Sequence, residues 1–351
     1  MSSKLRIAVV ANANSIHTIR WVNWLRQQEH RVTIFSLNEA EDCIYFGPEP
    51  PLDRSLIFNL GKNVRKTTGE LQSKIDEFKP DIVHGFFLVN HGMYASRIEG
   101  YPKVMTAMGS DILIAPKESK LLSWIVKRAI KNSDSIFGPP LLVDEIEKWN
   151  LNTELNENII GIDCSIFKPS EKTKTIVFAR GFKEVYNPIV VSKAIEVLSS
   201  KLDNYEFILC GDGPLKPESE RILSYCKNVQ FTGQISETKL AEIIGKAELV
   251  LSPSLSDSIP LTILEAVASG TPVVASNIPA NQKWVDRKLP VFLFKTEDSE
   301  SLVEEILKVI KDDSILENTV KTGPNLIKEK YRWEKEAEKV LKKYVDLVTS
   351  N

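Results

Sequence analysis

Residues 252–276 read SPSLSDSIPLTILEAVASGTPVVAS, a pattern that predicts a loop, an apolar helix, a second loop and a buried strand. Pro260 suits the first helical turn, because its missing N–H would have no partner there in any case. The three short polar residues at 256–258 are types that cap free N–H groups before a helix. Gly270 marks the end of the helix, and the β-branched run at 271–276 then predicts a strand.

The N-terminus of this predicted helix has a carboxylate on either side of it. Asp257 and Glu265 stand eight positions apart and bracket the entry to the helix. Free N–H groups and the helix dipole make such an N-terminus a binding site for phosphate. A carboxylate one turn into the helix can accept hydrogen bonds from sugar hydroxyls. The residues therefore suggest a nucleotide-sugar site.

The same stretch resembles the donor-binding signature of the family 4 retaining glycosyltransferases (glycosyl transferases group 1), which have the GT-B fold. Asp257 stands where the family usually has the first Glu of its Glu-x7-Glu pattern, and Glu265 matches the second. The resemblance implies that Asp257 contacts the donor sugar and that Glu265 holds the ribose. Because Asp is one methylene shorter than Glu, the substitution puts the donor-sugar preference in question more than the activity. The residues implied to meet the diphosphate at the helix entry are Ser258, Ile259, Pro260 and Leu261.

Composition and charge narrow the class of protein. The chain has 351 residues, of which 42% are hydrophobic and 26% charged, as in ordinary globular proteins, and this length predicts two domains. A net charge of −2 gives no basic field for nucleic acid. The four cysteines form no CxxC, and the four histidines have no HExxH-like spacing. We therefore expect reduced thiols, no metal site and no permanently bound cofactor.

We expect the N-terminal apolar run to be the first strand rather than a leader. It comprises Leu5 and residues 7–11, which is too short for a signal peptide. No segment approaches the roughly 18 apolar residues of a membrane span. We expect a cytoplasmic protein.

Short apolar runs alternate with longer segments of helical period along the whole chain, which predicts parallel sheets built from βα units. Strands are predicted at 5–11, 32–36, 56–58, 82–85, 103–107, 135–138, 175–179, 206–210, 229–232, 249–252, 272–275 and 291–294. Helices are predicted at 16–29, 63–78, 90–98, 118–132, 141–148, 187–200, 215–226, 236–246, 260–269, 300–311 and 333–348.

This rhythm predicts an α/β protein with two Rossmann-like domains. We expect an N-terminal acceptor-side domain at 1–165 and a C-terminal nucleotide-sugar-binding domain at 166–332. The GT-B resemblance implies that the two sheets face each other across a cleft. It also implies that a C-terminal helix at 333–351 crosses back and packs on the first domain.

Arg180 directly follows the predicted strand at 175–179, where ligands of parallel sheets bind. An Arg there can clamp a diphosphate with its fork of donors, while the structural alternative is a surface Arg paired with a local carboxylate. The family has Gly-Arg-x(4–5)-Lys at this point, and both basic residues bind the donor diphosphate. Here Lys183 is the nearest basic residue, and Tyr186 and Asn187 are candidates to replace the missing Lys.

Two glycine turns complete the implied donor site. CysGlyAspGlyPro at 210–214 matches the family's Gly-x-Gly-Pro loop, with Gly211 and Gly213 in order. Each glycine permits a tight turn and the close approach of a ligand to the backbone. Gly233 ends a Phe-Thr-Gly turn that borders the nucleobase in the family.

The first half matches the family less well. Its opening turn, AsnAlaAsnSerIleHis at 12–17, lacks both the family's Gly-Gly and GxGxxG, which argues against a dinucleotide-binding oxidoreductase. In ThrAlaMetGlySerAspIle at 106–112, Met108 replaces the usual His and Asp111 remains. His91 is a second candidate, at the start of a predicted helix, with a structural role as its alternative. The expected catalytic residues are Asp257, Arg180, Asp111 and His91.

A basic stripe at 117–131 has two interpretations. Cationic residues recur around a Trp and face an apolar side, in the order Lys117, Lys120, Trp124, Lys127, Arg128 and Lys131. Such a face can lie against anionic lipid headgroups, which would place the protein peripherally at the inner membrane face with a lipid-linked acceptor. The alternative is an ordinary packed helix with a solvated outer side.

The favoured function is transfer of a sugar from a nucleotide diphosphate sugar, the co-substrate, to a hydroxyl of a sugar or lipid-linked saccharide acceptor. Retention of configuration, independence of metal and a setting in polysaccharide or glycolipid assembly follow from the resemblance. The alternatives are a catalytically silent GT-B nucleotide-binding protein and a GT-B epimerase or phosphorylase. A periplasmic two-domain binding protein has the same rhythm, but the short N-terminal run argues against it.

Overall fold

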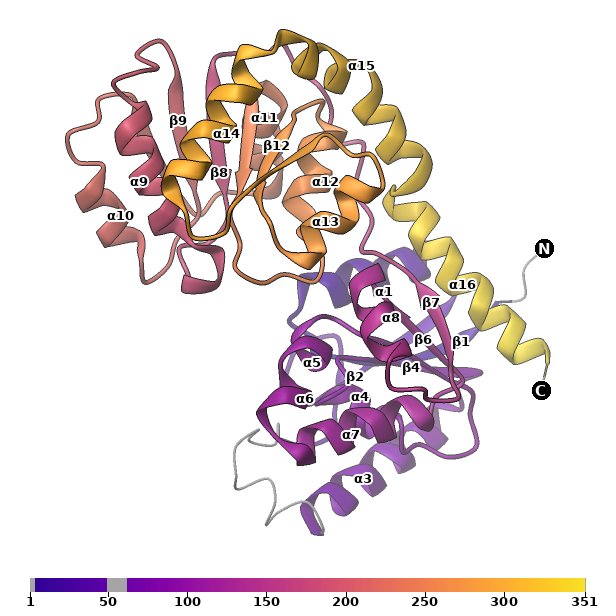
Figure 1. Ribbon diagram of the computed structural model, residues 1–351. Coiled ribbons are helices and arrows are strands. Elements are labelled where there is room, and N and C mark those ends of the chain that lie inside the picture. Colours follow the sequence, from indigo (N-terminus) through magenta and orange to yellow (C-terminus); the bar gives the residue numbers. More distant parts are fainter. Residues whose placement is uncertain (1–3, 49–61, 351) are drawn as a thin grey trace. The chain divides into compact units, whose positions relative to one another are not determined.

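The computed structural model describes residues 4–48 and 62–350. The chain divides into two compact units, the first formed by Met1–Ile159 with Ala337–Asn351 and the second by Ile160–Glu336. Each unit is built on its own parallel sheet, and Figure 1 shows the helices that cover each sheet.

The first unit contains a seven-stranded sheet in the order β3-β2-β1-β4-β5-β6-β7, and every neighbouring pair is parallel. Its strands are β1 (Arg6–Val10), β2 (Arg31–Ser36), β3 (Ile44–Tyr45), β4 (Ile82–Phe86), β5 (Lys103–Thr106), β6 (Ser135–Gly138) and β7 (Glu154–Glu157). Its helices are α1 (Ile16–Gln27), α3 (Lys62–Phe78), α4 (His91–Ala95), α5 (Ser110–Leu113), α6 (Ala115–Glu118), α7 (Lys120–Lys131) and α8 (Pro140–Glu147).

The second unit contains a six-stranded parallel sheet in the order β10-β9-β8-β11-β12-β13. Its strands are β8 (Thr175–Ala179), β9 (Glu206–Cys210), β10 (Val229–Gly233), β11 (Leu249–Ser252), β12 (Val273–Ser276) and β13 (Val291–Phe294). Its helices are the 3-10 turn η1 (Glu184–Tyr186), α9 (Pro188–Leu198), α10 (Lys216–Ile222), α11 (Glu237–Lys246), α12 (Leu261–Ala268), α13 (Pro279–Asp286), α14 (Ser299–Lys311) and α15 (Asp313–Lys330).

The central strands of both sheets are apolar runs because both faces are covered. All residues of β11 and of β12 are buried, and so are the last four of β1. Parallel sheets bury both faces under their crossover helices, which is why these strands do not alternate between polar and apolar residues. In the second unit α9 and α14 lie side by side over the sheet (Figure 1). The prediction of two parallel α/β domains is therefore confirmed.

Several elements differ from the sequence-based expectation. The predicted helix at 118–132 forms as α7, which begins two residues later because Ser119 caps it by accepting a hydrogen bond from the N–H of Leu122. The predicted strand at 56–58 lies outside the described residues. The elements that the patterns did not predict are β3, β7, α5, α6, α13 and α15.

The unpredicted α15 has 18 residues and contains Pro324 in its interior. The preceding residue, Gly323, explains how it packs, because a Cβ there would lie 2.7 Å from the carbonyl oxygen of Val267 on α12. The close approach of two helices therefore needs Gly at this position, although Gly and Pro usually argue against a helix.

The last helix, α16 (Trp333–Thr349), carries the chain from the second unit to the first. Its fully buried Tyr344 bonds through the hydroxyl to Nδ1 of His84 on β4, whose Nε2 lies 2.8 Å from Oγ1 of Thr106 on β5. Trp21 packs edge-on against both rings, with centroids 6.1 Å from His84 and 6.3 Å from Tyr344. Burial lowers the pKa of His84 to about 3, so this histidine is a neutral core residue that helps to hold α16 on the first sheet.

Candidate functional site

Arg180 lies immediately after β8, at the carboxyl end of a central strand of the second sheet. Its Nη2 pairs with Oδ2 of Asp257 at 2.5 Å, and the two side chains are only 14% and 12% exposed. The guanidinium also sits over the ring of Tyr186, 4.2 Å from the centroid. A planar cation held by a carboxylate and an aromatic face is pre-oriented for a bidentate anion. Its buried Nε makes no hydrogen bond, so a donor remains for a ligand.

Asp257 connects this arginine to the entry of α12. Its Oδ1 accepts a hydrogen bond from the N–H of Ile259 at 3.2 Å. The N-cap position itself, Pro260, makes no side-chain cap hydrogen bond. Pro260 is the N-cap residue rather than part of the first turn, so the helix begins at Leu261. The positive end of the α12 dipole therefore lies directly after the loop that Asp257 holds.

The glycines of the 210–214 turn pack against the segment that begins at Arg180. Gly211 has φ 110° and a Cβ there would lie 2.8 Å from the Arg180 carbonyl oxygen, while one at Gly213 (φ 153°) would lie 2.6 Å from that of Phe182. The N–H of Phe182 donates to the Asp212 carbonyl at 3.0 Å. These glycines are therefore needed for contact between two backbones, which brings the turn beside Arg180.

The other predicted donor-site residues lie around the same sheet edge. The N–H of Gly211 donates to the carbonyl of Gly233 at 2.8 Å, and a Cβ at Gly233 would meet nothing within 4 Å. Lys183 is exposed just before η1. Glu265 is half-buried one turn into α12, and Ser258 and Ile259 are half-buried in the loop before it.

One backbone contact that sequence reasoning missed joins the two site loops. The N–H of Leu255 donates to the carbonyl of Val185 at 2.8 Å. Together with the Arg180–Asp257 pair and the Tyr186 ring, it joins the loop after β8 to the loop after β11. The sequence indicated Tyr186 as a candidate to replace the family's Lys. It did not predict that these two loops would contact each other.

Asp111 is fully buried in the first unit, where it organises a loop. Its carboxylate accepts hydrogen bonds from the backbone N–H groups of Leu88 at 3.0 Å, Met108 at 3.1 Å and Gly109 at 2.8 Å. Burial raises the pKa of Asp111, and these N–H donors counteract part of that rise. The carboxylate therefore ties the loop after β5 to the loop after β4.

His91 is likewise buried and hydrogen-bonded to the backbone of its own unit. It begins α4, is 3% exposed, and its Nε2 accepts a hydrogen bond from the N–H of Leu37 at 3.2 Å. Burial lowers its pKa to about 4, so the ring is neutral near pH 7. His91 and Asp111 belong to the first unit, and the predicted donor-site residues from Arg180 to Glu265 belong to the second.

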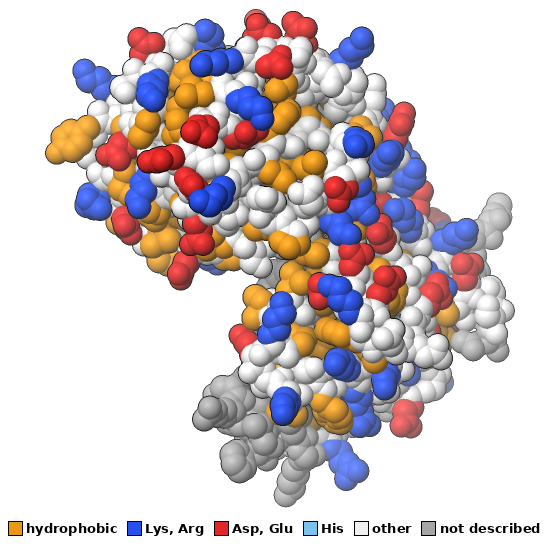
Figure 2. All heavy atoms as spheres, viewed as in Figure 1, with side chains coloured by type: hydrophobic (Ala, Val, Ile, Leu, Met, Phe, Trp, Pro, Cys, Tyr) orange, Lys and Arg blue, Asp and Glu red, His pale blue; other side chains and the backbone are white. Residues whose placement is uncertain are grey.

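The basic stripe at 117–131 is divided between α6 and α7. Its exposed members are Lys117, Lys120, Trp124, Arg128 and Lys131. Arg128 lies over the ring of Trp124 at 5.2 Å, and Lys127 lies over Trp149 at 5.3 Å. On the face of the molecule in Figure 2, basic and acidic side chains are interspersed. Within residues 4–48 and 62–350, no helix is long and apolar enough to cross a membrane, and no three His, Cys, Asp or Glu residues are grouped to hold a metal ion.

Comparison with known proteins extends these observations over both units. Residues 165–326 match the family model described as glycosyl transferases group 1, and residues 6–138 match the model glycosyl transferase 4-like. The chain is 24% identical over 89% of its length to sulfoquinovosyl transferase SQD2 of Arabidopsis thaliana, covering 66% of that protein. It is 21% identical over 86% of its length to N-acetyl-alpha-D-glucosaminyl L-malate synthase of Bacillus anthracis, covering 84% of that protein.

A solved structure shares the fold of the whole chain. HepE of Anabaena in complex with UDP superimposes with a TM-score of 0.79 at 14% identity, over 98% of this chain and all of that one. At this identity the similarity shows the fold alone, and it confirms the predicted GT-B class. Two family models cover the two units, and two glycosyltransferase relatives extend over most of the chain. The protein belongs to the group 1 glycosyltransferases of the GT-B fold.

Proposed function

We propose that the protein transfers a sugar from a nucleotide diphosphate sugar to a hydroxyl acceptor, with retention of configuration, in polysaccharide or glycolipid assembly. The observation that carries the proposal is the Arg180–Asp257 pair, whose aspartate lies in the loop that leads to the N-terminus of α12. HepE, which shares the fold, has been solved with UDP and with UDP-glucose.

In this reaction the bond between the anomeric carbon and the diphosphate oxygen breaks, and a bond from that carbon to the acceptor oxygen forms on the same face. The acceptor loses its hydroxyl proton, and the nucleoside diphosphate leaves. Negative charge develops on the diphosphate, so the favourable groups are cations and N–H dipoles aimed at it. Arg180, Lys183 and the first turn of α12 supply these without a metal ion.

The two carboxylates of the signature take different roles in the proposal. Asp257 already orients Arg180 and accepts the N–H of Ile259, so it can contact a donor sugar without moving its own loop. Glu265 is the only charged residue of α12 and lies one turn inside the helix, within reach of ribose hydroxyls. For His91 and Asp111, the contacts favour a role in positioning the loops of the first unit.

The test is donor binding and slow donor hydrolysis with UDP-, GDP-, ADP- and TDP-sugars in the presence of a metal chelator. Arg180→Ala and Glu265→Ala should each weaken binding and turnover, while Arg221→Ala, an exposed arginine on α10, should change neither. Wild-type binding and turnover in both site variants would sink the assignment. Because Met108 replaces the family's His, nucleotide binding without any sugar release would favour the catalytically silent alternative. Product analysis separates transfer from epimerisation and phosphorolysis.

The exposed basic side of α7 supports peripheral membrane contact as part of the proposal. Lys120 and Lys131 are exposed there and flank the half-exposed Trp124. Cations around an interfacial Trp attract anionic headgroups by roughly 1 kcal/mol each. Sedimentation with vesicles containing anionic lipid should be reduced in Lys120→Gln/Lys131→Gln. Equal sedimentation of the variant and the wild type, or none of either, would remove this part of the proposal.

A further inference from the structure

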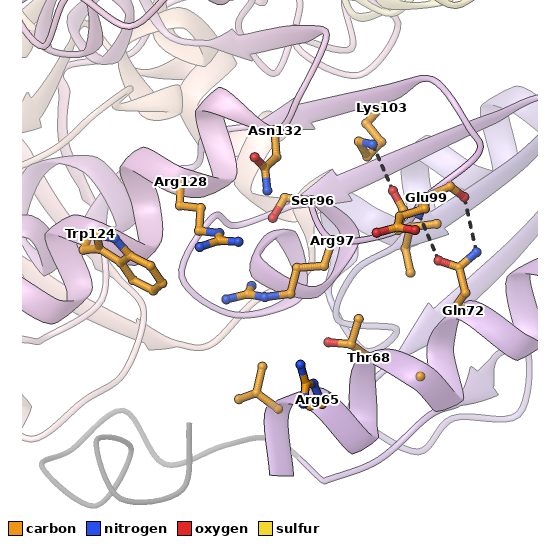
Figure 3. A pocket seen from close by; sticks show the side chains of 13 residues that line it. Arg65, Thr68, Gln72, Ser96, Arg97, Glu99, Lys103, Trp124, Arg128 and Asn132 are labelled. Carbon is orange, nitrogen blue, oxygen red and sulfur yellow. Dashed lines mark hydrogen bonds between the residues drawn. The ribbon is translucent and has the colours of Figure 1, made fainter. Parts of the chain in front are cut away.

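A pocket of about 860 Å³ lies within the first unit, between α3, the end of α4 and α7 (Figure 3). Its size is within the range of small-molecule sites. Lys103, which begins β5, also lines it, so the pocket reaches the amino end of that strand. Ligands of open parallel sheets bind at the carboxyl ends instead. This pocket is therefore separate from the sheet edge at which acceptors of this fold are expected.

Three arginines, two from helices and one from the segment after a helix, point into this space. Arg65 comes from α3, Arg97 follows α4, and Arg128 comes from α7 (Figure 3). Among the described residues none of the three has a carboxylate within ion-pair distance, and the one carboxylate in the lining belongs to the exposed Glu99. Arginines at a protein surface often pair with a neighbouring Asp or Glu. Three arginines without such a carboxylate partner concentrate positive charge in the pocket.

Arg97 shows that this charge is partly inside the protein. It is half-buried, and its Nη1 donates to the carbonyl of Met93 at 2.5 Å. Burial, followed by the nearby charge of Arg128, lowers the pKa of Arg97. A cation that is both desolvated and repelled by its neighbour gains most from an anion placed between the two.

The lining also offers an unused polar group. Oγ1 of Thr68 is buried and makes no hydrogen bond, although buried hydroxyls are usually paired. The ring of Trp124 is half exposed at the rim, beside Arg128. Guanidinium donors, a free hydroxyl and an aromatic edge are the groups that recognise a phosphate attached to a ring or a short organic body.

We propose that this pocket binds a small soluble phosphate or diphosphate compound, at a site additional to the donor site around Arg180. A flat membrane surface fits the geometry less well, because Arg97 and Thr68 lie inside the pocket rather than on the exposed side of α7. The inference stands independently of the proposed function, since its residues belong to the first unit and those of the donor site to the second.

The experiment is calorimetric titration of the full chain with inorganic pyrophosphate at low salt, repeated in the Arg180→Ala background, in which binding at the donor site is weakened. Saturable binding should persist in Arg180→Ala. It should weaken by at least about tenfold in Arg65→Gln/Arg128→Gln, which removes two charge-assisted contacts. Lys120→Gln/Lys131→Gln is the matched control, because it removes the same charge from residues that line only the neighbouring hollow on α7.

Thr68→Val provides an independent readout. The hydroxyl has no partner in the free protein, so its loss should leave the thermal midpoint unchanged or raised while weakening pyrophosphate binding several-fold. The proposal is overturned if Arg180→Ala shows no saturable pyrophosphate binding. It is overturned as well if Arg65→Gln/Arg128→Gln and Lys120→Gln/Lys131→Gln lose pyrophosphate affinity equally. It is also overturned if only anionic vesicles, and not pyrophosphate, bind in a manner that depends on Arg65 and Arg128.

Discussion

Arg180 and Asp257 form a 2.5 Å ion pair although 77 residues separate them in the chain. They meet because β8 and β11 are adjacent parallel strands, so the loops that follow these strands emerge at the same sheet edge. Both side chains are largely buried, so neither charge is compensated well by water if the other is removed.

Substitutions in this pair should therefore affect the unfolding free energy and donor binding in different ways. Arg180→Ala should lower the free energy of unfolding by about 3 kcal/mol, because Asp257 is left buried and unpaired. Arg180→Ala/Asp257→Ala should recover much of that loss in urea unfolding but should not recover donor binding. Additive losses in the double variant would contradict an energetic coupling between the two residues.

The 210–214 turn should not accept side chains. Gly213→Ala should destabilise the second unit by about 2 kcal/mol or more, because its Cβ would overlap the carbonyl of Phe182 and its φ of 153° is strained for other residues. Gly233→Ala is the matched control, since it has a positive φ of 66° but open space around its Cβ. Urea midpoints of the two variants give the comparison, and equal midpoints would show that the backbone contact is unimportant.

Asp111→Asn tests the loop-holding role of the buried carboxylate. An amide retains one acceptor but turns an NH₂ group toward backbone N–H donors, so at least one of the bonds from Leu88, Met108 and Gly109 is lost. We expect a loss of about 1–3 kcal/mol in unfolding free energy with donor affinity unchanged. Wild-type stability combined with abolished turnover would instead place Asp111 in direct contact with substrate.

The buried histidines should make the first unit sensitive to acid. The pKa of His84 is lowered to about 3 and that of His91 to about 4, whereas both titrate near 6.5 when unfolded. Between about pH 6.5 and pH 4 the unfolded chain binds more protons, so stability falls as pH falls, by about 1.4 kcal/mol per pH unit for each histidine.

Urea unfolding at pH 7.5 and pH 5 measures this effect. His91→Gln keeps an acceptor for the N–H of Leu37. It should remove from the pH dependence of the unfolding free energy the part that one histidine contributes. An unfolding free energy that is the same at both pH values would contradict the neutral, buried state of the two rings.

The parallel strands could be predicted because a strand that is buried on both faces has a continuous run of apolar residues. The runs at 175–179 and 249–252 are apolar and short, and glycine or polar turns follow them. The edge strands β3 and β7 could not be predicted in this way. β3 has only two residues and β7 reads ELNE, so their strand character comes from pairing with a neighbour.

Packing decided other elements against their local signals. Gly323 and Pro324 argue against a helix from propensity alone, yet α15 continues through them because the glycine lets it pack closely on α12. The stripe at 117–131 has helical period throughout, yet Ser119 divides it by capping α7. In α15 a contact with another helix outweighs the local pattern, whereas at Ser119 a local cap divides the stripe.

The sequence by itself determined the two βα series, the order of the donor-site motifs and the family, because these depend on residue type and spacing along the chain. Only the tertiary structure decided that Arg180 pairs with Asp257, that His91 and Asp111 are held by their own backbone, and that three arginines share one pocket. These contacts depend on which strands and helices become neighbours in space. The sequence around each residue does not show which distant residue it will contact.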